Sequence, residues 1–354
     1  MKKLKIGIIG NGGICKVAHL PCYIRETTQA EIVALCDIKS ERAEEIRDKY
    51  FPNAKVYSDY KELLKNEDVE AVDICTPNYL HSIIAVDAFE AGKHVFCEKP
   101  DAVNVEEVLK MEAASKKAGK VLMVMRNNRF TQASQYAKKY IDEGKMGEIY
   151  AGRAAWQRRR GIPGKGGWFT TKALSGGGPL IDLGVHMIDL AIWLMGNPTP
   201  VAVSGNTFCK FADSDVSDSF NSTYGDANSE GTFDVEDLAM GMIRFDNGAI
   251  LQIEFSWASN IERETRFVEL RGTKSGLKWT DESLDIYSED NGCLTNTHMV
   301  NTAESNGHGK NLEHFIDVVL NGTEPSFKPQ QGIDMIKILT AIYESAETGK
   351  EVIL

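Results

Sequence analysis

The chain has 354 residues, of which 42% are hydrophobic and 26% charged, and its formal net charge at pH 7 is −11. This length exceeds the usual size of one hydrophobic core and predicts two domains. The acidic balance argues against nucleic acid or an anionic membrane surface as a partner. No apolar run approaches the length of a membrane span, and the start of the chain lacks the apolar segment of a secretory signal, so we expect a cytoplasmic protein.

The first 125 residues alternate short apolar, β-branched runs with helical segments. Strands are expected at 5–9, 31–37, 71–75, 94–98 and 121–125, and helices at 42–50, 82–92 and 105–119. Strands that are apolar throughout and separated by helices are typical of a parallel sheet covered on both faces. We therefore predict an α/β, doubly wound nucleotide-binding domain over residues 1–126.

The first expected strand runs into a glycine-rich turn, GNGGIC, at 10–15. Glycines at 10 and 12 suit a tight turn whose backbone amides approach a pyrophosphate at a helix N-terminus. The third glycine of the usual dinucleotide fingerprint is replaced here by Cys15, and an ordinary strand-to-helix turn is the alternative. The expected cofactor contacts in this turn are Gly10, Asn11, Gly12, Gly13 and Ile14.

Asp37 ends the second expected strand, near the distance from the glycine turn at which an acidic residue binds the adenosine ribose hydroxyls. A carboxylate there repels a 2′-phosphate and favours NAD over NADP, although Lys39 and Arg42 nearby temper that preference. A helix N-cap is the alternative role. Strand, glycine turn, helix, strand and acid in this order predict dinucleotide binding.

The seven cysteines are odd in number, scattered and never spaced as CxxC. Cys36, Cys75 and Cys97 lie in strand-like runs, where a free cysteine behaves as a small hydrophobe. This pattern predicts neither a disulfide framework nor a metal site.

Two further loops follow the ends of expected strands, where folds of this kind bind ligands. They are TPNYLH at 76–81 and EKP at 98–100. A lysine between an apolar strand and a proline is unusual for a surface lysine. The alternative role for Lys99 is a salt bridge with a carboxylate such as Glu98.

The second half of the chain has longer, alternating strand-like runs and fewer helices. The run 238–257 contains an Asn-Gly turn signal and predicts a hairpin, in which one face is apolar and the other polar, as in a half-buried antiparallel sheet. Helices are expected at 131–144, 310–321 and 329–348. The acidic, serine-rich stretch 211–231 is expected to be a mobile surface loop.

The stretch SGGGPLIDLGVHMIDLAIWLM, at 175–195, carries Asp182 and His186 on an otherwise apolar helix. Side chains at i and i+4 share one helix face, so the two residues are able to act as a unit. A capped helix start beside a core histidine is the alternative. Asp189, three residues further on, is expected to be a hydrogen-bonding partner within the helix packing.

Taken together, these motifs make the chain resemble the Gfo/Idh/MocA family of NAD(P)-dependent oxidoreductases. The resemblance covers nearly the whole chain, and its most specific parts are EKP and GGxxxDxGxHxxD. It implies an N-terminal Rossmann domain and, over residues 127–354, an α+β domain for substrate binding and oligomerisation. This second domain would contain a large open, mostly antiparallel sheet through which homodimers or homotetramers form.

The resemblance also implies roles for single residues. It makes Lys99, Asp182 and His186 the catalytic group. Further cofactor contacts are expected at Thr76, Pro77, Asn78, His81, Glu98 and Lys99. The glycines before Asp182 are expected to allow the close approach of cofactor or substrate.

These residue types suit the oxidation of a carbinol. With an ordinary pKa near ~6.5, His186 is able to accept and return the hydroxyl proton. Asp182 is expected to orient the imidazole and stabilise its cation, and Lys99 to stabilise the developing alkoxide.

Asn127, Arg160 and Trp168 are further candidates for substrate contacts. The cluster Arg158–Arg160 would suit an acidic sugar, with solvated charge as the alternative. The leading prediction is an NAD-dependent oxidoreductase acting on a sugar, cyclitol or related polyol. The alternatives are a glycoside hydrolase that uses bound NAD for transient oxidation and elimination, and a non-catalytic, dinucleotide-responsive regulator.

Overall fold

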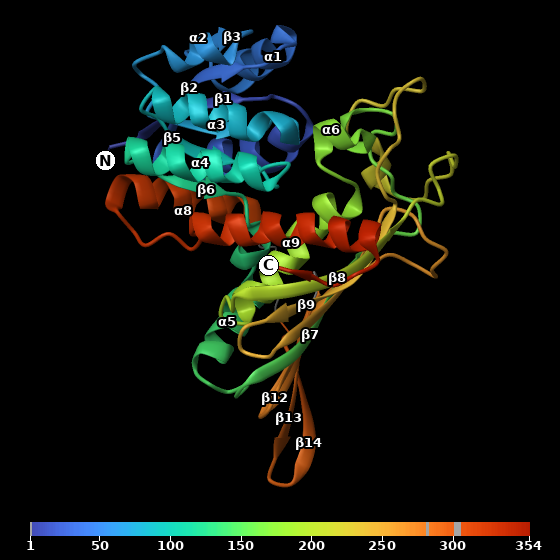
Figure 1. Ribbon diagram of the computed structural model, residues 1–354. Coiled ribbons are helices and arrows are strands. Elements are labelled where there is room, and N and C mark those ends of the chain that lie inside the picture. Colours follow the sequence, from blue (N-terminus) through green and yellow to red (C-terminus); the bar gives the residue numbers. More distant parts are fainter. Residues whose placement is uncertain (1, 281–282, 301–305) are drawn as a thin grey trace. The chain divides into compact units, whose positions relative to one another are not determined.

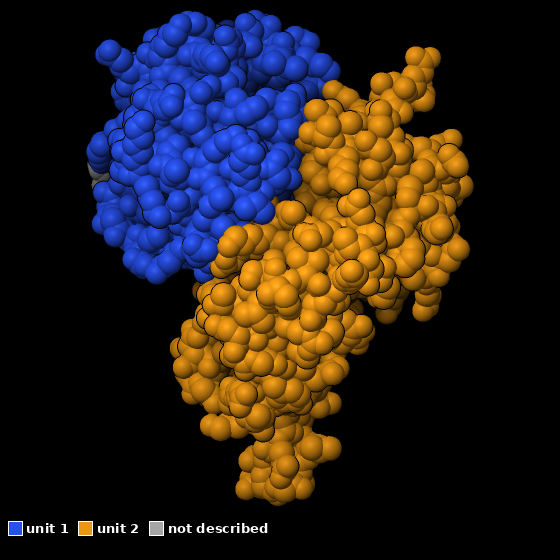
Figure 2. All heavy atoms as spheres, viewed as in Figure 1, with its two compact units in different colours: residues 1–127, 307–333 blue, residues 128–306, 334–354 orange. Residues whose placement is uncertain are grey.

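The computed structural model describes residues 2–280, 283–300 and 306–354 (Figure 1). Its internal contacts divide the chain into two compact units, coloured separately in Figure 2. Unit 1 consists of Met1–Asn127 and Gly307–Ile333, and unit 2 of Asn128–Asn306 and Asp334–Leu354. Residues 307–333, which are separated from residue 127 by most of unit 2 in sequence, therefore belong with the N-terminal unit.

Unit 1 is built on a six-stranded parallel sheet with the strand order β3-β2-β1-β4-β5-β6. Its strands are β1 (Leu4–Ile9), β2 (Ala30–Cys36), β3 (Lys55–Tyr57), β4 (Ala71–Ile74), β5 (His94–Cys97) and β6 (Leu122–Val124). The doubly wound sheet and its five expected strands are confirmed. The short β3, with no continuous apolar run, was missed.

Helices cover both faces of this sheet. On one face lie α2 (Tyr60–Leu64), α3 (His81–Glu90) and, beside α3, α4 (Val105–Ala118). On the other face the core is closed by α1 (Ser40–Tyr50), by two π-helical turns, η1 (Cys15–His19) and η2 (Cys22–Glu26), and by α8 (Gly307–Asn321). Phe96 of β5 packs against Phe315 of α8 with ring centroids 5.3 Å apart. These contacts explain why α8 folds with unit 1.

The helix that follows the glycine turn is irregular. Its π-helical turns η1 and η2 flank Pro21, which has no N–H to donate to the residue four positions earlier. Wide turns of this kind are frequent at functional sites. The irregular helix directs His19 inward, where it is fully buried.

Unit 2 is built on a nine-stranded sheet with the strand order β14-β13-β12-β11-β7-β10-β9-β8-β15. Its strands are β7 (Ile149–Gln157), β8 (Pro200–Phe208), β9 (Leu238–Phe245), β10 (Ile250–Ser256), β11 (Thr265–Gly272), β12 (Ser275–Thr280), β13 (Leu284–Asp290), β14 (Cys293–His298) and β15 (Val352–Ile353). The pair β7–β10 is parallel and the other neighbours are antiparallel. The expected large, mostly antiparallel sheet is confirmed.

The predicted hairpin is β9–β10, and its apolar side is the core of unit 2. Leu251, Ile253 and Phe255 are buried, whereas Gln252 between them is exposed. On this side lie η6 (Leu180–Gly184) and α7 (Val185–Leu194), with α5 (Gln132–Asp142) beside α7. Two further α-helices are α6 (Lys172–Ser175) and α9 (Pro329–Thr348), and residues 329–333 of α9 belong to unit 1. Within 211–231 the regular structure is a single 3-10 turn, η7 (Phe220–Thr223).

The helical stretch Lys172–Leu194 is long and apolar enough to cross a membrane by length and composition alone. However, 83% of its most apolar window is buried inside the protein. A stretch that is covered in this way is typical of the core helix of a globular unit.

Asp189 anchors this core helix. Both of its carboxylate oxygens accept from the guanidinium of Arg129, at 2.8 and 2.6 Å, and both residues are buried. The expected structural role of Asp189 is confirmed.

We expect Asp189→Ala to lower the free energy of unfolding by about 3–5 kcal/mol, because it leaves the Arg129 charge buried without its partner. Urea denaturation of the whole chain measures this loss. The control is Asp142→Ala, which removes an exposed ion pair with Lys138 on α5 and should change stability little. Equal stability of the two variants would contradict the anchoring role.

Candidate active site

The glycine turn lies between the carboxyl ends of β2 and β4. Gly10 has a φ of +91°, and a Cβ at this position would lie 2.7 Å from the carbonyl oxygen of Cys75. Its N–H donates to the carbonyl of Cys36 at 2.8 Å. Both the left-handed backbone and the close approach therefore require glycine here. Cys15, in place of the third fingerprint glycine, is fully buried in the core beneath the turn.

The rim of this turn is suited to a dinucleotide. A Cβ built on Gly12 would meet no atom of the described residues within 4 Å, so the backbone is open to a ligand. Among the residues that the structure describes, buried Asn11 Oδ1 and Thr76 Oγ1 have no hydrogen-bond partner. Buried polar atoms are nearly always paired. A bound dinucleotide would supply the missing partners, so the residues present fit NAD.

Asp37 follows β2 and faces the same turn. Its Oδ2 accepts from the backbone N–H of Asn11 at 2.7 Å, and its Oδ1 from that of Lys39 at 2.9 Å. The helix α1 begins after Lys39, and no side chain caps it. Asp37 therefore organises the turn, and its two oxygens retain lone pairs for ribose hydroxyls.

The loop 76–81 is tied to the EKP turn through His81. The buried ring lies between two carbonyl oxygens, that of Pro100 at 2.8 Å from Nδ1 and that of Thr76 at 2.9 Å from Nε2. Burial lowers the pKa of His81, and the hydrogen bonds to the two backbone carbonyls oppose this effect. Pro77 precedes η3 (Asn78–Leu80), in which Asn78 is buried. His81 thus fastens the two predicted cofactor loops together.

The EKP turn follows β5 and contains one buried and one half-buried charged residue. Glu98 is buried, and its Oε2 accepts from the backbone N–H of Lys99 at 3.1 Å. Its Oε1 lies 2.7 Å from Nε2 of His19. Lys99 itself is half-buried. The Glu98 carboxylate holds the backbone that carries the predicted catalytic lysine.

In unit 2, Asp182 lies in the π-helical turn η6 and His186 in the first turn of α7. Oδ2 of Asp182 accepts from the indole N–H of Trp257 at 3.0 Å, and the guanidinium of Arg158 lies close enough for its pKa to respond to the Asp182 charge. Burial lowers the pKa of Arg158, and the charge of Asp182 opposes this effect. The Trp257 N–H and the Arg158 guanidinium therefore both lie near the carboxylate of the predicted catalytic acid.

His186 is half-buried beside an aromatic wall. Its ring centroid lies 6.0 Å from that of Trp156 in β7. Trp156 donates its indole N–H to Glu264 at 2.7 Å, and the guanidinium of Arg266 lies 4.1 Å from its ring centroid. The carbonyl of His186 accepts from the side chain of Asn128 at 3.4 Å. The imidazole thus lies beside Trp156 of β7, and the backbone of His186 is held by Asn128 from the segment before α5.

Gly178, one of the glycines before Asp182, packs closely against the backbone of Glu236. A Cβ at Gly178 would lie 2.0 Å from the carbonyl oxygen of Glu236. The buried Glu236 carboxylate accepts from the backbone N–H groups of Gly178 and Leu180, each at 3.0 Å, and from the hydroxyl of Tyr343 at 2.9 Å. At Gly178 the close neighbour is thus the chain's own acid, which caps the helix start, and the expected approach of cofactor or substrate at the glycines stays a prediction.

The three predicted substrate residues lie in different surroundings. Arg160 donates to Ser259 O at 2.8 Å and to Asn260 at 2.7 Å, so it braces a surface loop. Trp168 stacks on Phe169, with centroids 3.8 Å apart. Asn127 is half-buried at the end of unit 1. None of these positions is tested by the structure, and all three remain predictions.

Two family models together cover most of the chain. Residues 4–126 match the model of the oxidoreductase family with an NAD-binding Rossmann fold, and residues 134–278 match the GFO/IDH/MocA C-terminal domain. The chain belongs to the Gfo/Idh/MocA family. Unit 1 is therefore an NAD-binding Rossmann domain, and the chain is an oxidoreductase.

Curated members of the Gfo/Idh/MocA family match over almost the full length. D-glucoside 3-dehydrogenase of Escherichia coli (strain K12) is 36% identical over 99% of this chain and 97% of its own length. Levoglucosan dehydrogenase of Pseudarthrobacter phenanthrenivorans is 31% identical over 88% of this chain and 83% of its own. A solved structure of levoglucosan dehydrogenase in complex with NADH and levoglucosan has a TM-score of 0.85, with 27% identity and 99% of each chain covered. The expected family, fold class and enzymatic character are confirmed.

Sequence reasoning missed several neighbours of the Gfo/Idh/MocA motif residues. Trp156 was not chosen, and Arg158 was named only as part of the cluster Arg158–Arg160. Residues two apart in a strand share one face and Ala154 is buried, so this alternation would have placed Trp156 and Arg158 on the buried face and Arg159 on the opposite face. His19 and Asp73 were also missed, and an aspartate within the apolar run AVDIC was the available signal.

Proposed function

We propose that this chain is an NAD-dependent dehydrogenase that oxidises a ring hydroxyl of a D-glucoside or a related pyranose. The observation that carries the proposal is the near-full-length similarity to a D-glucoside 3-dehydrogenase. Likeness to levoglucosan dehydrogenase, which acts on an anhydrosugar, supports the same substrate class. The open glycine turn and the two unpartnered oxygen atoms beside it support the binding of NAD.

When bound, NAD supplies the acceptor for a hydride from the carbinol carbon. The residues that would hold it are the turn at Gly10–Gly12, Asp37 at the adenosine ribose, and the loops fastened by His81. Each of them lies at the carboxyl end of a strand of the parallel sheet, where ligands of such sheets bind.

The proton of the hydroxyl is assigned to His186, as general base in oxidation and general acid in reduction. Asp182 is assigned to orient the imidazole and to stabilise its cation, and the Trp257 N–H fixes the direction of that carboxylate. Lys99 stabilises negative charge that develops on the substrate oxygen. These three roles rest on the residue types and on their match to the family motif.

The test is a panel of glucosides, anhydrosugars, cyclitols and polyols, assayed with NAD and with NADP. Absorbance of the reduced nicotinamide and release of aglycone are both recorded. We expect stoichiometric reduction of NAD with a pyranose substrate. Aglycone release without net reduction would establish the hydrolase alternative, and no turnover of any pyranose would overturn the proposal.

Asp37 gives a separate prediction on cofactor choice. Asp37→Asn keeps one oxygen acceptor, for either the Asn11 or the Lys39 amide, and removes the charge that repels a 2′-phosphate. We expect the preference for NADH over NADPH to fall, with the larger loss in Asp37→Ala. Fluorescence titration of both cofactors measures the ratio. Asp48→Ala, an exposed charge removed at the end of α1, serves as the control, and an unchanged ratio in both Asp37 variants would refute the role.

A further inference from the structure

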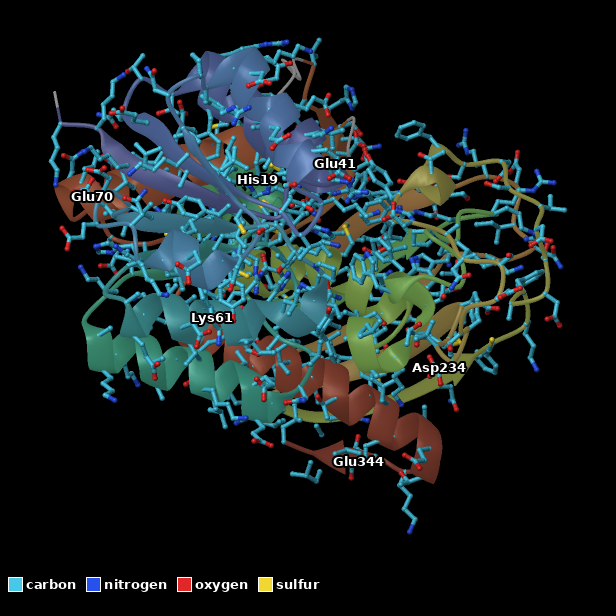
Figure 3. The ribbon with its side chains drawn as sticks, turned by 90° about the horizontal axis from the view of Figure 1, so that it is seen from above. His19, Glu41, Lys61, Glu70, Asp234 and Glu344 are labelled. Atoms are coloured by element: carbon cyan, nitrogen blue, oxygen red, sulfur yellow. The ribbon has the colours of Figure 1, made fainter. Side chains whose placement is uncertain are left out.

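A buried charged network lies beneath the EKP turn, and the histidine at its centre has no part in the roles assigned above. His19 is at its centre, fully buried within unit 1, where Figure 3 labels it among the strands and helices. Nδ1 of its ring lies 2.8 Å from Oδ2 of Asp73, and Nε2 lies 2.7 Å from Oε1 of Glu98. Asp73 is itself fully buried, in the middle strand β4.

The geometry defines the charge of this network. An ionised carboxylate only accepts hydrogen bonds, so a ring that faces a carboxylate oxygen on each side satisfies both contacts when both ring nitrogens carry a proton. Buried carboxylates persist in the ionised form only when they are paired. An imidazolium between two carboxylates meets both requirements.

The surrounding groups are consistent with this state. The Tyr23 hydroxyl donates to Asp73 Oδ2 at 2.9 Å, and the thiol of Cys75 donates to Asp73 Oδ1 at 3.7 Å. Burial alone would lower the pKa of His19, but the charges and hydrogen bonds of Asp73 and Glu98 raise it well above the usual value.

Three basic residues, His19, His308 and Lys99, favour the ionised form of Glu98. Burial opposes its ionisation, but the hydrogen bond and charge of His19, together with the charges of His308 on α8 and of Lys99, lower its pKa to about 2. The ionised carboxylate then accepts from the Lys99 amide through its second oxygen. One carboxylate thus joins the buried imidazolium to the backbone of the EKP turn.

We propose that His19 is a positioning residue, which as an imidazolium held between Asp73 and Glu98 fixes the Glu98 carboxylate and, through it, the backbone of Lys99. The inference rests on the proposed function for the catalytic role of Lys99. The network joins the π-helical turn η1 after the glycine turn to the ends of β4 and β5. It therefore links the helix that follows the pyrophosphate-binding turn to the lysine turn.

A metal ion is the competing explanation for this cluster. His19, Asp73 and Cys75 offer ligand atoms within 4.8 Å of one another. However, both ring nitrogens of His19 already lie at hydrogen-bond distance from carboxylate oxygens, and Asp73 Oδ2 also accepts from the Tyr23 hydroxyl. A ring nitrogen that donates to a carboxylate has no lone pair for a metal ion, so the hydrogen-bonded imidazolium accounts better for the contacts.

The first test measures the protonation state of the His19 ring. With ¹⁵N-labelled histidine in the full chain, the His19 signals are identified by their loss in His19→Gln. We expect both ring nitrogens to carry protons at about pH 8.5, roughly two units above the ordinary histidine pKa. A neutral ring at that pH, or zinc that copurifies with the parent and is lost in His19→Gln, would overturn the proposal.

The second test measures the effect of His19 on the EKP turn, by amide hydrogen exchange and by kcat. We expect His19→Gln to speed amide hydrogen exchange in the segment 97–102 and to lower kcat by about 10²-fold, the effect of a small displacement of a catalytic group. The Kd for NADH should stay near that of the parent. The control is His94→Gln at the other end of β5, whose ring accepts from the Val121 amide at 3.1 Å. Equal exchange in His19→Gln, His94→Gln and the parent would overturn the positioning role.

A double variant distinguishes positioning from general damage to the fold. If His19 acts through Glu98, His19→Gln/Glu98→Gln should lose no more kcat than Glu98→Gln alone, because coupled residues are not additive. Fully additive losses would contradict the inference. If the parent turns over no sugar, the proposed function fails, while the ring protonation and the exchange of 97–102 still decide the role of His19.

Discussion

His186→Ala is expected to lower kcat by about 10²–10⁴-fold, the usual contribution of a positioned general acid or base. The affinity for NADH should be nearly unchanged, because the residues assigned to the dinucleotide are the glycine turn, Asp37 and the loops fastened by His81. Half-burial beside Trp156 holds the ring without removing it from solvent. Steady-state kinetics on the best pyranose and fluorescence titration of NADH provide the two measurements.

The matched control for this prediction is His298→Ala. His298 is an exposed histidine of β14, and its ring contacts Asp285 at 2.7 Å. Its removal should leave kcat unchanged. Added imidazole should restore part of the activity of His186→Ala and none to an Asp182→Ala variant. Turnover at the parental rate in His186→Ala would exclude the acid–base assignment.

The sequence predicted features that depend on neighbours along the chain. The turn at Gly10, the acid at Asp37 and the alternation of β10 are set by local backbone conformation and by burial of one strand face. Gly10 adopts the positive φ that the tight turn requires. Phe255 is buried because it lies on the apolar face of β10, which packs against the core. Such requirements appear directly in the order of residue types.

Contacts between distant residues were not predictable in the same way. His19 meets Asp73 and Glu98 across 54 and 79 positions of sequence, and Asp182 meets Trp257 across 75. The sequence pattern showed that Asp73 lies in an apolar strand and Trp257 on a core face. It did not show which residues form hydrogen bonds with them. The partners of His19 follow from the strand order of unit 1, which places β4 between β1 and β5.

Three buried polar residues of unit 1 are held in the same way. Asp73, Glu98 and His81 are buried at or near the carboxyl ends of adjacent strands, and each is held by atoms from another loop or turn. A buried charge is costly unless its partners are fixed. These pairs require a rigid backbone at the ends of the strands. Hydride transfer also requires that the groups around the reacting atoms are held in a fixed geometry.

Lys99→Met is expected to lower kcat by about 10²–10³-fold, the cost of removing one group that stabilises developing negative charge. Methionine keeps the length and apolar stem of the side chain, and the Lys99 amide remains available to Glu98 Oε2. The EKP backbone should therefore keep its position, and the loss should fall on the chemical step rather than on binding. Single-turnover kinetics with saturating sugar and NAD measure that step directly.

Lys99→Arg and Lys61→Met complete the experiment. Arginine keeps the charge but offers a planar fork in place of a compact ammonium, so we expect activity between that of the parent and that of Lys99→Met. Lys61 is exposed on α2, and its loss should leave kcat unchanged. A Lys99→Met variant that keeps the parental single-turnover rate but binds NADH more weakly would show that Lys99 holds the cofactor instead of stabilising the substrate oxygen.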